Sequence, residues 1–283
     1  MMSGVSDEDE SDNMICCAAC GVAENENIRL KKCNACKSVR YCSVQCQKDH
    51  MPQHKRACKK LVAELRDEIL FKQPESTHLG DCPICCLPLP IDDDKYIMMA
   101  CCSKMICNGC NYANRMRELE GTAKSQKEAE RDLMKRAEAN DPVYMSQVGV
   151  RCYQEGDYKG AFGYLTKAAG LGDAVAHFQL SCMYYDGKGV QKDKKKEVYH
   201  VEQAAIRGHL RARHNLGFIE KAVKHWIIAA NMGYDGPLEN LKLEYREGLV
   251  SKEDYASALR GHQTAVDAAK SSQRDEAEAA RIK

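Results

Sequence analysis

The sequence predicts a multidomain chain in which small metal-stabilised α+β fingers precede an all-α helical-repeat solenoid. Three observations lead to this fold class. Of the 17 cysteines, 15 lie between Cys16 and Cys110. From about residue 141 onward, helix and turn motifs recur at a fixed period, as they do in helical repeats. A charged segment without cysteine separates the two regions, and 283 residues at roughly 150 per domain also suggest two domains or more.

Composition and charge exclude several classes of protein. Lys+Arg 42 against Asp+Glu 41 gives a net charge of +1, which excludes a globally basic nucleic-acid binder. The longest apolar runs are far shorter than the roughly 18 residues of a membrane helix. The acidic stretch from Asp7 to Asp12 is unlike a signal peptide, so we expect an intracellular protein, cytoplasmic and/or nuclear. An odd number of clustered cysteines in a reducing compartment indicates metal binding rather than disulfides.

Changes of composition along the chain predict its segments. Acidic and polar residues without periodicity indicate disorder, whereas dense charge with one glycine indicates a solvated helix. The predicted order is a disordered acidic tail (1–14), a cysteine-rich finger with a trailing helix (15–73), a second cysteine block (79–113), a charged helical linker (114–140), helical repeats (141–267) and a fraying helical tail (268–283).

The first cysteine block contains four pairs of candidate metal ligands. Two cysteines separated by two residues lie on one tight turn, whereas ligands separated by three residues lie one helical turn apart. Zinc takes four such ligands in a tetrahedron, so eight ligands predict two closed sites, and closed sites are structural. The pairs are Cys17 with Cys20, Cys33 with Cys36, Cys42 with Cys46, and His54 with Cys58.

The run from Arg40 to Cys58, with its Tyr-Cys-Ser and Cys-Gln pairs, resembles a MYND-type zinc finger over residues 17–58. The resemblance implies that the fingers bind proteins, in several cases proline-containing peptides. Met51 stands where the family usually has tryptophan. At this position the sequence therefore lacks the flat aromatic ring that lines the peptide groove in that family. We expect Cys16 to be a spare thiol and His50 to be a packing residue. The resemblance also implies interleaved zinc sites, one of Cys17, Cys20, Cys42 and Cys46 and the other of Cys33, Cys36, His54 and Cys58.

The finger carries a local positive charge. Residues 16–73 contain 12 Lys/Arg and 6 Asp/Glu, which favours an acidic or phosphorylated protein partner. Nucleic acid is a rival partner, but only Tyr41 interleaves an aromatic ring with the basic residues. After the finger, Val62, Leu65 and Ile69 recur at helical spacing and predict a helix that caps the finger.

The second block resembles the first half of a RING finger. Position 104 is lysine where a RING has a histidine ligand, and the closing cysteine pair is missing. Two readings remain: a half-finger with a single, third zinc, or part of a ubiquitin ligase. The run Asp92 to Asp94 is read as a solvated turn rather than a calcium site. The candidate ligands are Cys82, Cys85, Cys107 and Cys110, and the spare thiols are Cys86, Cys101 and Cys102.

The repeat region has a period of 36 residues, measured from Gly172 to Gly208 and from Leu180 to Leu216. Each unit reads as helix, glycine-containing turn, helix, and paired alanines let helices approach closely. These units resemble Sel-like repeats, which are relatives of tetratricopeptide repeats. The third unit is 11 residues short after Glu220. It therefore predicts either one continuous helix or a shortened, locally unstable unit.

These features predict a non-enzymatic adaptor or scaffold in which the finger and the solenoid each bind a protein or peptide. No nucleophile triad, open metal site or nucleotide loop points to catalysis or to a small-molecule substrate. The Gly187-Lys188-Gly189 run is a turn, and the histidines of the repeats are packing or surface residues. The alternatives are a ubiquitin-ligase component, a nucleic-acid-associated regulator, and a methyltransferase, whose catalytic domain has no matching segment.

Overall fold

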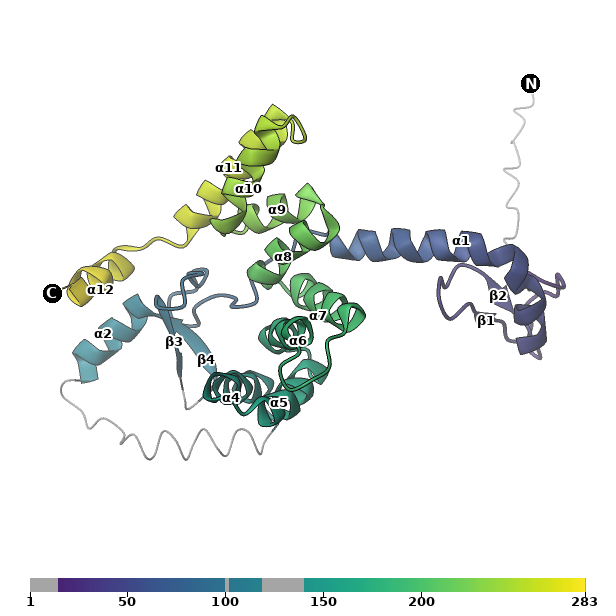
Figure 1. The fold of residues 1–283 in the computed structure, drawn as a ribbon, viewed down its shortest axis with the longest axis horizontal. Coiled ribbons are helices and arrows are strands. Elements are labelled where there is room, and N and C mark those ends of the chain that lie inside the picture. The colour runs from purple at the N-terminus through teal and green to yellow at the C-terminus, as the bar shows by residue number, and fades with distance from the viewer. Residues whose placement is uncertain (1–14, 100–101, 119–139, 283) are drawn as a thin grey trace, which may run out of the picture. The chain divides into compact units, whose positions relative to one another are not determined.

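The protein is described by a computed structural model that covers residues 15–99, 102–118 and 140–282 (Figure 1). The chain divides into two compact units, Met1–Ile69 and Leu70–Lys283, so the second cysteine block belongs to the same unit as the repeats. The predicted acidic tail, most of the predicted charged linker and Cys101 lie outside the described residues. None of the helices within the described ranges is both long and apolar enough to cross a membrane.

The first unit consists of a small antiparallel hairpin and one long helix. Strand β1 (Lys31–Lys32) pairs with β2 (Arg40–Tyr41), with Lys31 opposite Tyr41. Helix α1 (Val44–Leu70) follows at once, and the Ser43 hydroxyl caps its first turn by accepting from the Cys46 N–H at 3.1 Å. The cysteines, Leu30 and Tyr41 form the small core.

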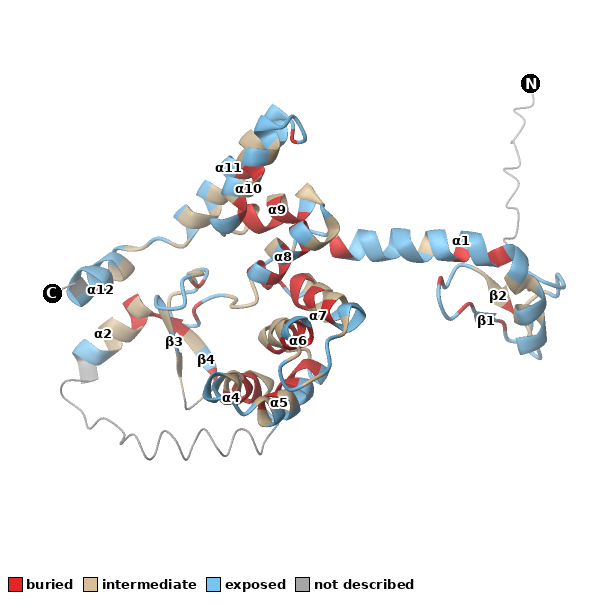
Figure 2. Cartoon of the chain, in the orientation of Figure 1, coloured by how far each residue is buried: buried red, intermediate tan, exposed pale blue. Residues whose placement is uncertain are grey.

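The second half of α1 is exposed, which corrects one expectation. Val62, Leu65 and Ile69 do lie on a helix, but 38%, 38% and 56% of their surfaces face solvent. Figure 2 shows this part of α1 in the colour of exposed residues. These three side chains do not cap the finger, because α1 continues past the finger without folding back onto it.

The second unit begins with a β-hairpin and continues as helices. Strand β3 (Tyr96–Met99) pairs antiparallel with β4 (Lys104–Cys107), and α2 (Asn108–Glu118) follows. The helices that follow are α4 (Pro142–Glu155), α5 (Tyr158–Gly170), α6 (Ala174–Asp186), α7 (Lys194–Ile206), α8 (Leu210–Glu220), α9 (Val223–Asn231), α10 (Gly236–Arg246), α11 (Lys252–Ala268) and α12 (Ser272–Ile282). From α4 to α11, each helix packs on the next one along the chain.

Glycine and aspartate set the helix boundaries of the repeats. Gly156 and Gly172 have positive φ angles of 86° and 88°, which glycine adopts without the steric penalty of a side chain. Asp157 and Asp173 follow, and each carboxylate accepts a backbone N–H of the next helix. After Gly208 the same capping position is taken by His209, whose Nδ1 accepts from the Ala212 N–H at 3.2 Å.

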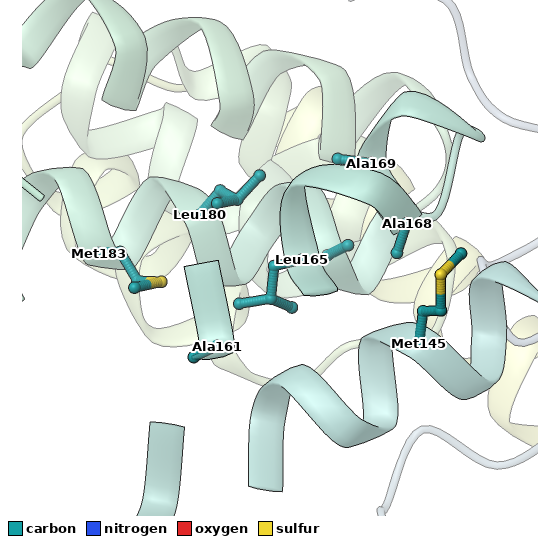
Figure 3. Packing of buried hydrophobic residues seen from close by; sticks show 8 residues of the cluster. Met145, Ala161, Leu165, Ala168, Ala169, Leu180 and Met183 are labelled. Carbon is teal, nitrogen blue, oxygen red and sulfur yellow. The ribbon is translucent and has the colours of Figure 1, made fainter. Parts of the chain in front are cut away.

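The repeat core is built from small and aliphatic side chains. Leu165 and Leu180 face the same interior space as Met145 and Met183 from neighbouring helices (Figure 3). The alanine pairs 168–169, 204–205 and 229–230 are all buried, as expected for small side chains that lie between packed helices. Helical repeats of this kind bury their core only against neighbouring units.

The shortened third unit folds as two helices, so the expectation of one continuous helix is wrong. Helices α8 and α9 are separated by Lys221 and Ala222. Trp226 packs so closely on Gly217 that a β-carbon there would lie 2.0 Å from the indole Nε1. The indole N–H donates to the His214 carbonyl at 3.1 Å, so the two short helices form a closed pair.

Lys221 ends α8 in the left-handed conformation, with φ 52° and ψ 40°. This conformation costs a non-glycine residue about 1–2 kcal/mol, and glycine avoids that cost at the expense of some chain entropy. We therefore expect Lys221→Gly to stabilise the second unit by about 0.5–1 kcal/mol in urea unfolding. Lys221→Ala retains the β-carbon and is the control, expected to leave the stability close to wild type.

Arg213 is buried within the second unit, although sequence reasoning did not single it out. Only 1% of its surface is exposed. Its guanidinium donates to the carbonyl of Leu70, at the end of α1, and to the carbonyl of Ala205, near the end of α7, the latter at 2.8 Å. Burial lowers its pKa to about 10. The side chain therefore joins two helix ends, and it shares the Ala205 carbonyl with the Gly208 N–H, which lies 3.0 Å away.

The C-terminal helix has a defined place. α12 packs against α2, although the sequence led us to expect a fraying tail. A β-carbon at Gly109 in α2 would lie 2.9 Å from the backbone of Gln273 and Arg274. Such a close approach requires glycine at that position.

Candidate metal centres

The first candidate centre lies in the first unit. The sulfur atoms of its four cysteines all lie within 4.8 Å of one another. Sγ of Cys42 lies 3.5 Å from Sγ of Cys20 and 3.5 Å from Sγ of Cys46. The members are Cys17, Cys20, Cys42 and Cys46, the set that the finger resemblance implies.

The second candidate centre is more deeply buried. The ligand atoms of Cys33, Cys36, His54 and Cys58 lie within 4.8 Å, and all four residues are buried. Cys36 Sγ lies 3.3 Å from His54 Nε2 and Cys33 Sγ lies 3.9 Å from Cys58 Sγ. His54 and Cys58 project from successive turns of α1, as their spacing predicts.

His50 lies outside this set of four. Its Nδ1 lies 3.1 Å from the hydroxyl of buried Tyr41, and its ring stacks on that of His54 with centroids 5.6 Å apart. His50 therefore packs on the imidazole of His54 without a hydrogen bond between the two rings in the described structure. The structure therefore gives His50 the packing role expected from sequence.

The third candidate centre lies in the second unit. Its four sulfur atoms also lie within 4.8 Å, and three of the four cysteines are buried. The N–H groups of Cys107 and Cys110 point to thiols of the cluster, at 3.5 Å to Cys82 Sγ and 3.4 Å to Cys107 Sγ. The members are Cys82, Cys85, Cys107 and Cys110.

One backbone turn recurs at the first cysteine pair of each centre. In each, the residue four positions after the first cysteine donates its N–H to that cysteine's carbonyl and has a positive φ angle. These residues are Gly21 (φ 75°), Lys37 (φ 59°) and Cys86 (φ 55°). The turn aims two thiols and several N–H groups inward, which is why a C-x2-C pair suits a metal. Cys86, which the sequence led us to expect as a spare thiol, thus supplies the positive-φ residue of this turn in the third centre.

The backbone of these turns favours thiolates. Burial opposes ionisation of Cys17, but hydrogen bonds from N–H groups, that of Cys20 foremost, lower its thiol pKa to about 6. At Cys36, hydrogen bonds from Ser38 outweigh the effect of burial and lower the thiol pKa to about 6. At Cys82, hydrogen bonds from N–H groups, that of Cys107 foremost, also outweigh burial and lower the thiol pKa to about 6. Each centre therefore holds at least one thiol that ionises near neutral pH, and thiolates are the form that binds metal.

The donor sets fit zinc. Two centres offer four thiolates and one offers three thiolates with an imidazole, which are the sets that hold structural zinc in a tetrahedron. A zinc ion held by any of these sets would have its four positions filled by the chain, as in structural zinc sites. The fit to zinc rests on this donor chemistry and on the convergence of the ligand atoms.

Arg274 of α12 lies against the third centre. Its guanidinium Nη2 lies 3.7 Å from Cys85 Sγ, and Nη1 donates to the Pro88 carbonyl at 2.8 Å. Burial would lower the pKa of Arg274, but hydrogen bonding and charge interaction with Cys107 and Cys85 raise it. No spacing in the sequence links a residue 189 positions away to this centre. Only the docking of α12 on α2 reveals it.

We expect Arg274→Gln to weaken zinc binding at the third centre about tenfold, because partners of metal ligands contribute about 10–100-fold in affinity. The physical reason is the loss of a cation that offsets the net charge of four thiolates around one zinc ion. The measurement is zinc release to a coloured chelator in a competition titration. Arg281→Gln is the control on the same helix, since Arg281 pairs with Asp94 at 2.8 Å away from the thiols. Equal zinc release by wild type and Arg274→Gln would refute the role of the arginine.

The remaining sequence candidates lie outside the three centres. Cys16 is exposed, and Cys102 is not grouped with other ligands in the described part of the chain. Lys104 is exposed on β4. Asp92, Asp93 and Asp94 each form a salt bridge with a basic residue, in agreement with a solvated turn.

Comparison with known proteins agrees with both halves of this description. Residues 17–58 match the MYND finger family, and residues 142–173, 174–209 and 219–234 match the Sel1 repeat family. A 51-residue stretch, 18% of the chain, is 41% identical to the SET domain and MYND-type zinc finger protein 6 of Schizosaccharomyces pombe. The match covers only 11% of that relative.

Two solved structures are similar to the chain. A Sel1 repeat protein from Oxalobacter formigenes is 28% identical with a TM-score of 0.44, over 56% of this chain and 72% of the other. A protective antigen with an SLR fold from uropathogenic Escherichia coli is 24% identical with a TM-score of 0.40, over 59% of this chain and 38% of the other.

Proposed function

Because the chain joins a MYND finger to Sel1 repeats, we propose that it is a zinc-binding adaptor whose two parts each bind a protein partner. Both modules are non-catalytic and commonly bind proteins. The observation that carries the proposal is their combination in one chain with four-ligand centres that leave no position open for chemistry.

Three structural zinc ions complete the proposal. Two would be held in the finger and one by the second cysteine block, with the twelve residues of the three centres as ligands. The domain boundaries expected from sequence remain part of the proposal, with the second block attached to the repeats through α2 and α12. A thiolate-rich chain of this kind suits a reducing, intracellular compartment, cytoplasmic or nuclear.

The finger presents basic residues to its partner. Lys31 and Lys32 are exposed on β1, and Lys48 and Lys55 are exposed on α1. Positive charge steers an acidic or phosphorylated protein toward such a surface. Met51 is half-buried on the same helix and supplies a flexible apolar contact in place of a flat aromatic ring.

The repeats present exposed aromatic rings instead. Tyr185 on α6, Tyr199 on α7 and Phe218 on α8 expose 64%, 54% and 54% of their surfaces. Aromatic side chains supply much of the energy at protein interfaces. Three exposed rings on three consecutive helices support a second binding surface that is chemically unlike the finger.

Interaction profiling of surface variants in cells tests the adaptor proposal. One variant reverses charge on the finger (Lys31→Glu with Lys32→Glu), and another truncates two rings on the repeats (Tyr199→Ala with Phe218→Ala). Crosslinking mass spectrometry should show two groups of partners, each lost in one variant only. Glu253→Gln, an exposed change in α11, is the control. If both variants retain every wild-type partner, or lose one common group, the two-surface adaptor is refuted.

A further inference from the structure

A cavity of about 770 Å³ lies within the second unit. It is bordered by the segment before the third centre, the loop after α9, the end of α11 and the start of α12. Pockets of about 300–1,000 Å³ bury ligands of the size of a drug or a short peptide segment. Apolar side chains form much of its lining, among them Pro74, Pro88, Pro90, Ile91, Met232 and Val266.

Every basic side chain that lines the cavity already has a partner. Lys95 pairs with Asp92 at 3.2 Å, Arg211 with Asp93 at 3.3 Å and Lys270 with Asp267 at 2.7 Å. Arg274 is committed to the third centre and to backbone carbonyls. The cavity therefore offers no basic group without a partner to an acidic ligand.

Four other carboxylates of the lining form no ion pair within salt-bridge distance in the described part of the chain, although Asp275 and Glu278 interact with the charges of Lys270 and Arg281. Glu75, Asp81, Asp275 and Glu278 line the cavity and are exposed at its rim. Within the described ranges none of them forms a salt bridge. They come from two stretches about 200 residues apart, so negative charge flanks the apolar lining on more than one element.

We propose that this cavity binds a short basic segment of a protein partner, in which lysine or arginine side chains alternate with apolar ones. The apolar residues would enter the cavity, and the cations would pair with the rim carboxylates. Dispersed carboxylates suit several cations spaced along one chain better than a single small cation. The inference rests on the proposed adaptor function and gives the second unit a partner opposite in charge to that of the finger.

Fluorescence anisotropy of the full-length, zinc-loaded chain tests this proposal. The probe is a fluorescein-labelled nine-residue peptide that alternates leucine with arginine. Matched peptides carry glutamate or glutamine in place of arginine. The variants are Asp81→Asn with Glu278→Gln at the rim and Val266→Trp inside the cavity. Glu247→Gln with Glu276→Gln removes the same charge from exposed positions outside the lining and is the control.

We expect the arginine peptide to bind more tightly than both matched peptides. The rim variant should raise its dissociation constant about tenfold, since two ion pairs at a surface contribute roughly that much. Val266→Trp should abolish binding, and the control should change the dissociation constant less than twofold.

Three results would overturn the proposal. They are equal binding of all three peptides, binding of the arginine peptide that both cavity variants leave unchanged, and peptide binding too weak to detect while spermine binds. The last result would assign the cavity to a small polyamine. None of these results bears on the partner groups lost by the finger and ring variants, so failure here is separable from failure of the adaptor proposal.

Discussion

Replacing Arg213 with alanine is expected to destabilise the second unit by about 3–5 kcal/mol. The guanidinium is buried and donates to the carbonyls of Leu70 and Ala205. Its removal takes the donor from the buried Leu70 carbonyl, which costs about 1–3 kcal/mol, and leaves a cavity that adds a further loss of similar size. The Ala205 carbonyl keeps the N–H of Gly208, at 3.0 Å, as a donor. The free energy of unfolding in urea, followed by helical circular dichroism, measures the loss.

Arg211→Ala is the matched control for this change. Arg211 lies on the same helix, but 59% of its side chain is exposed, and it forms only a surface salt bridge with Asp93. Such bridges contribute about 0–1 kcal/mol. If the two alanine variants lose the same stability, Arg213 does not join the helix ends in the way its hydrogen bonds indicate.

Replacing Cys36 with serine is expected to unfold the finger and to remove one zinc ion. Cys36 is buried beside His54, and it is one of four converging residues that could hold a metal ion at this centre. Structural zinc contributes on the order of 10 kcal/mol to the folding of small fingers, which far exceeds what their small cores supply. Hydrogen exchange should show loss of protection over residues 31–58, while α4–α9 keep theirs because they lie in the other compact unit.

Cys16→Ser is the control for the cysteine change, because Cys16 is exposed and lies outside the three centres. It should keep the zinc content and the hydrogen-exchange pattern of wild type. A Cys36→Ser chain with unchanged zinc and unchanged protection would show that this centre does not depend on the metal.

Much of the fold could be predicted because local signals decide it. A C-x2-C pair forms its turn through hydrogen bonds within five residues, as the turn from Cys33 to Lys37 shows. Glycine followed by aspartate, as at 156–157 and 172–173, ends one helix and caps the next. Residues that act over such short distances leave their pattern in the sequence.

Contacts between residues far apart in the chain leave no such pattern in the sequence. In the sequence, Arg213 cannot be told from any other charged residue on an amphipathic helix. Only the structure shows that its guanidinium donates to the Leu70 carbonyl at the end of α1. Arg274 approaches Cys85 only because α12 docks on α2. The exposed stripe of Val62, Leu65 and Ile69 was misjudged for a related reason, because helical spacing shows that a face is apolar but not what covers it.

The number of zinc ions per folded chain, measured by native mass spectrometry before and after chelation, tests the central claim most directly. Three ions are predicted, one for each of the three centres. The Arg274→Gln variant should lose one ion at a lower chelator concentration than wild type. A folded, reduced chain with only two ions would contradict the third centre, and one with no zinc would contradict the metal-stabilised finger on which the adaptor proposal depends.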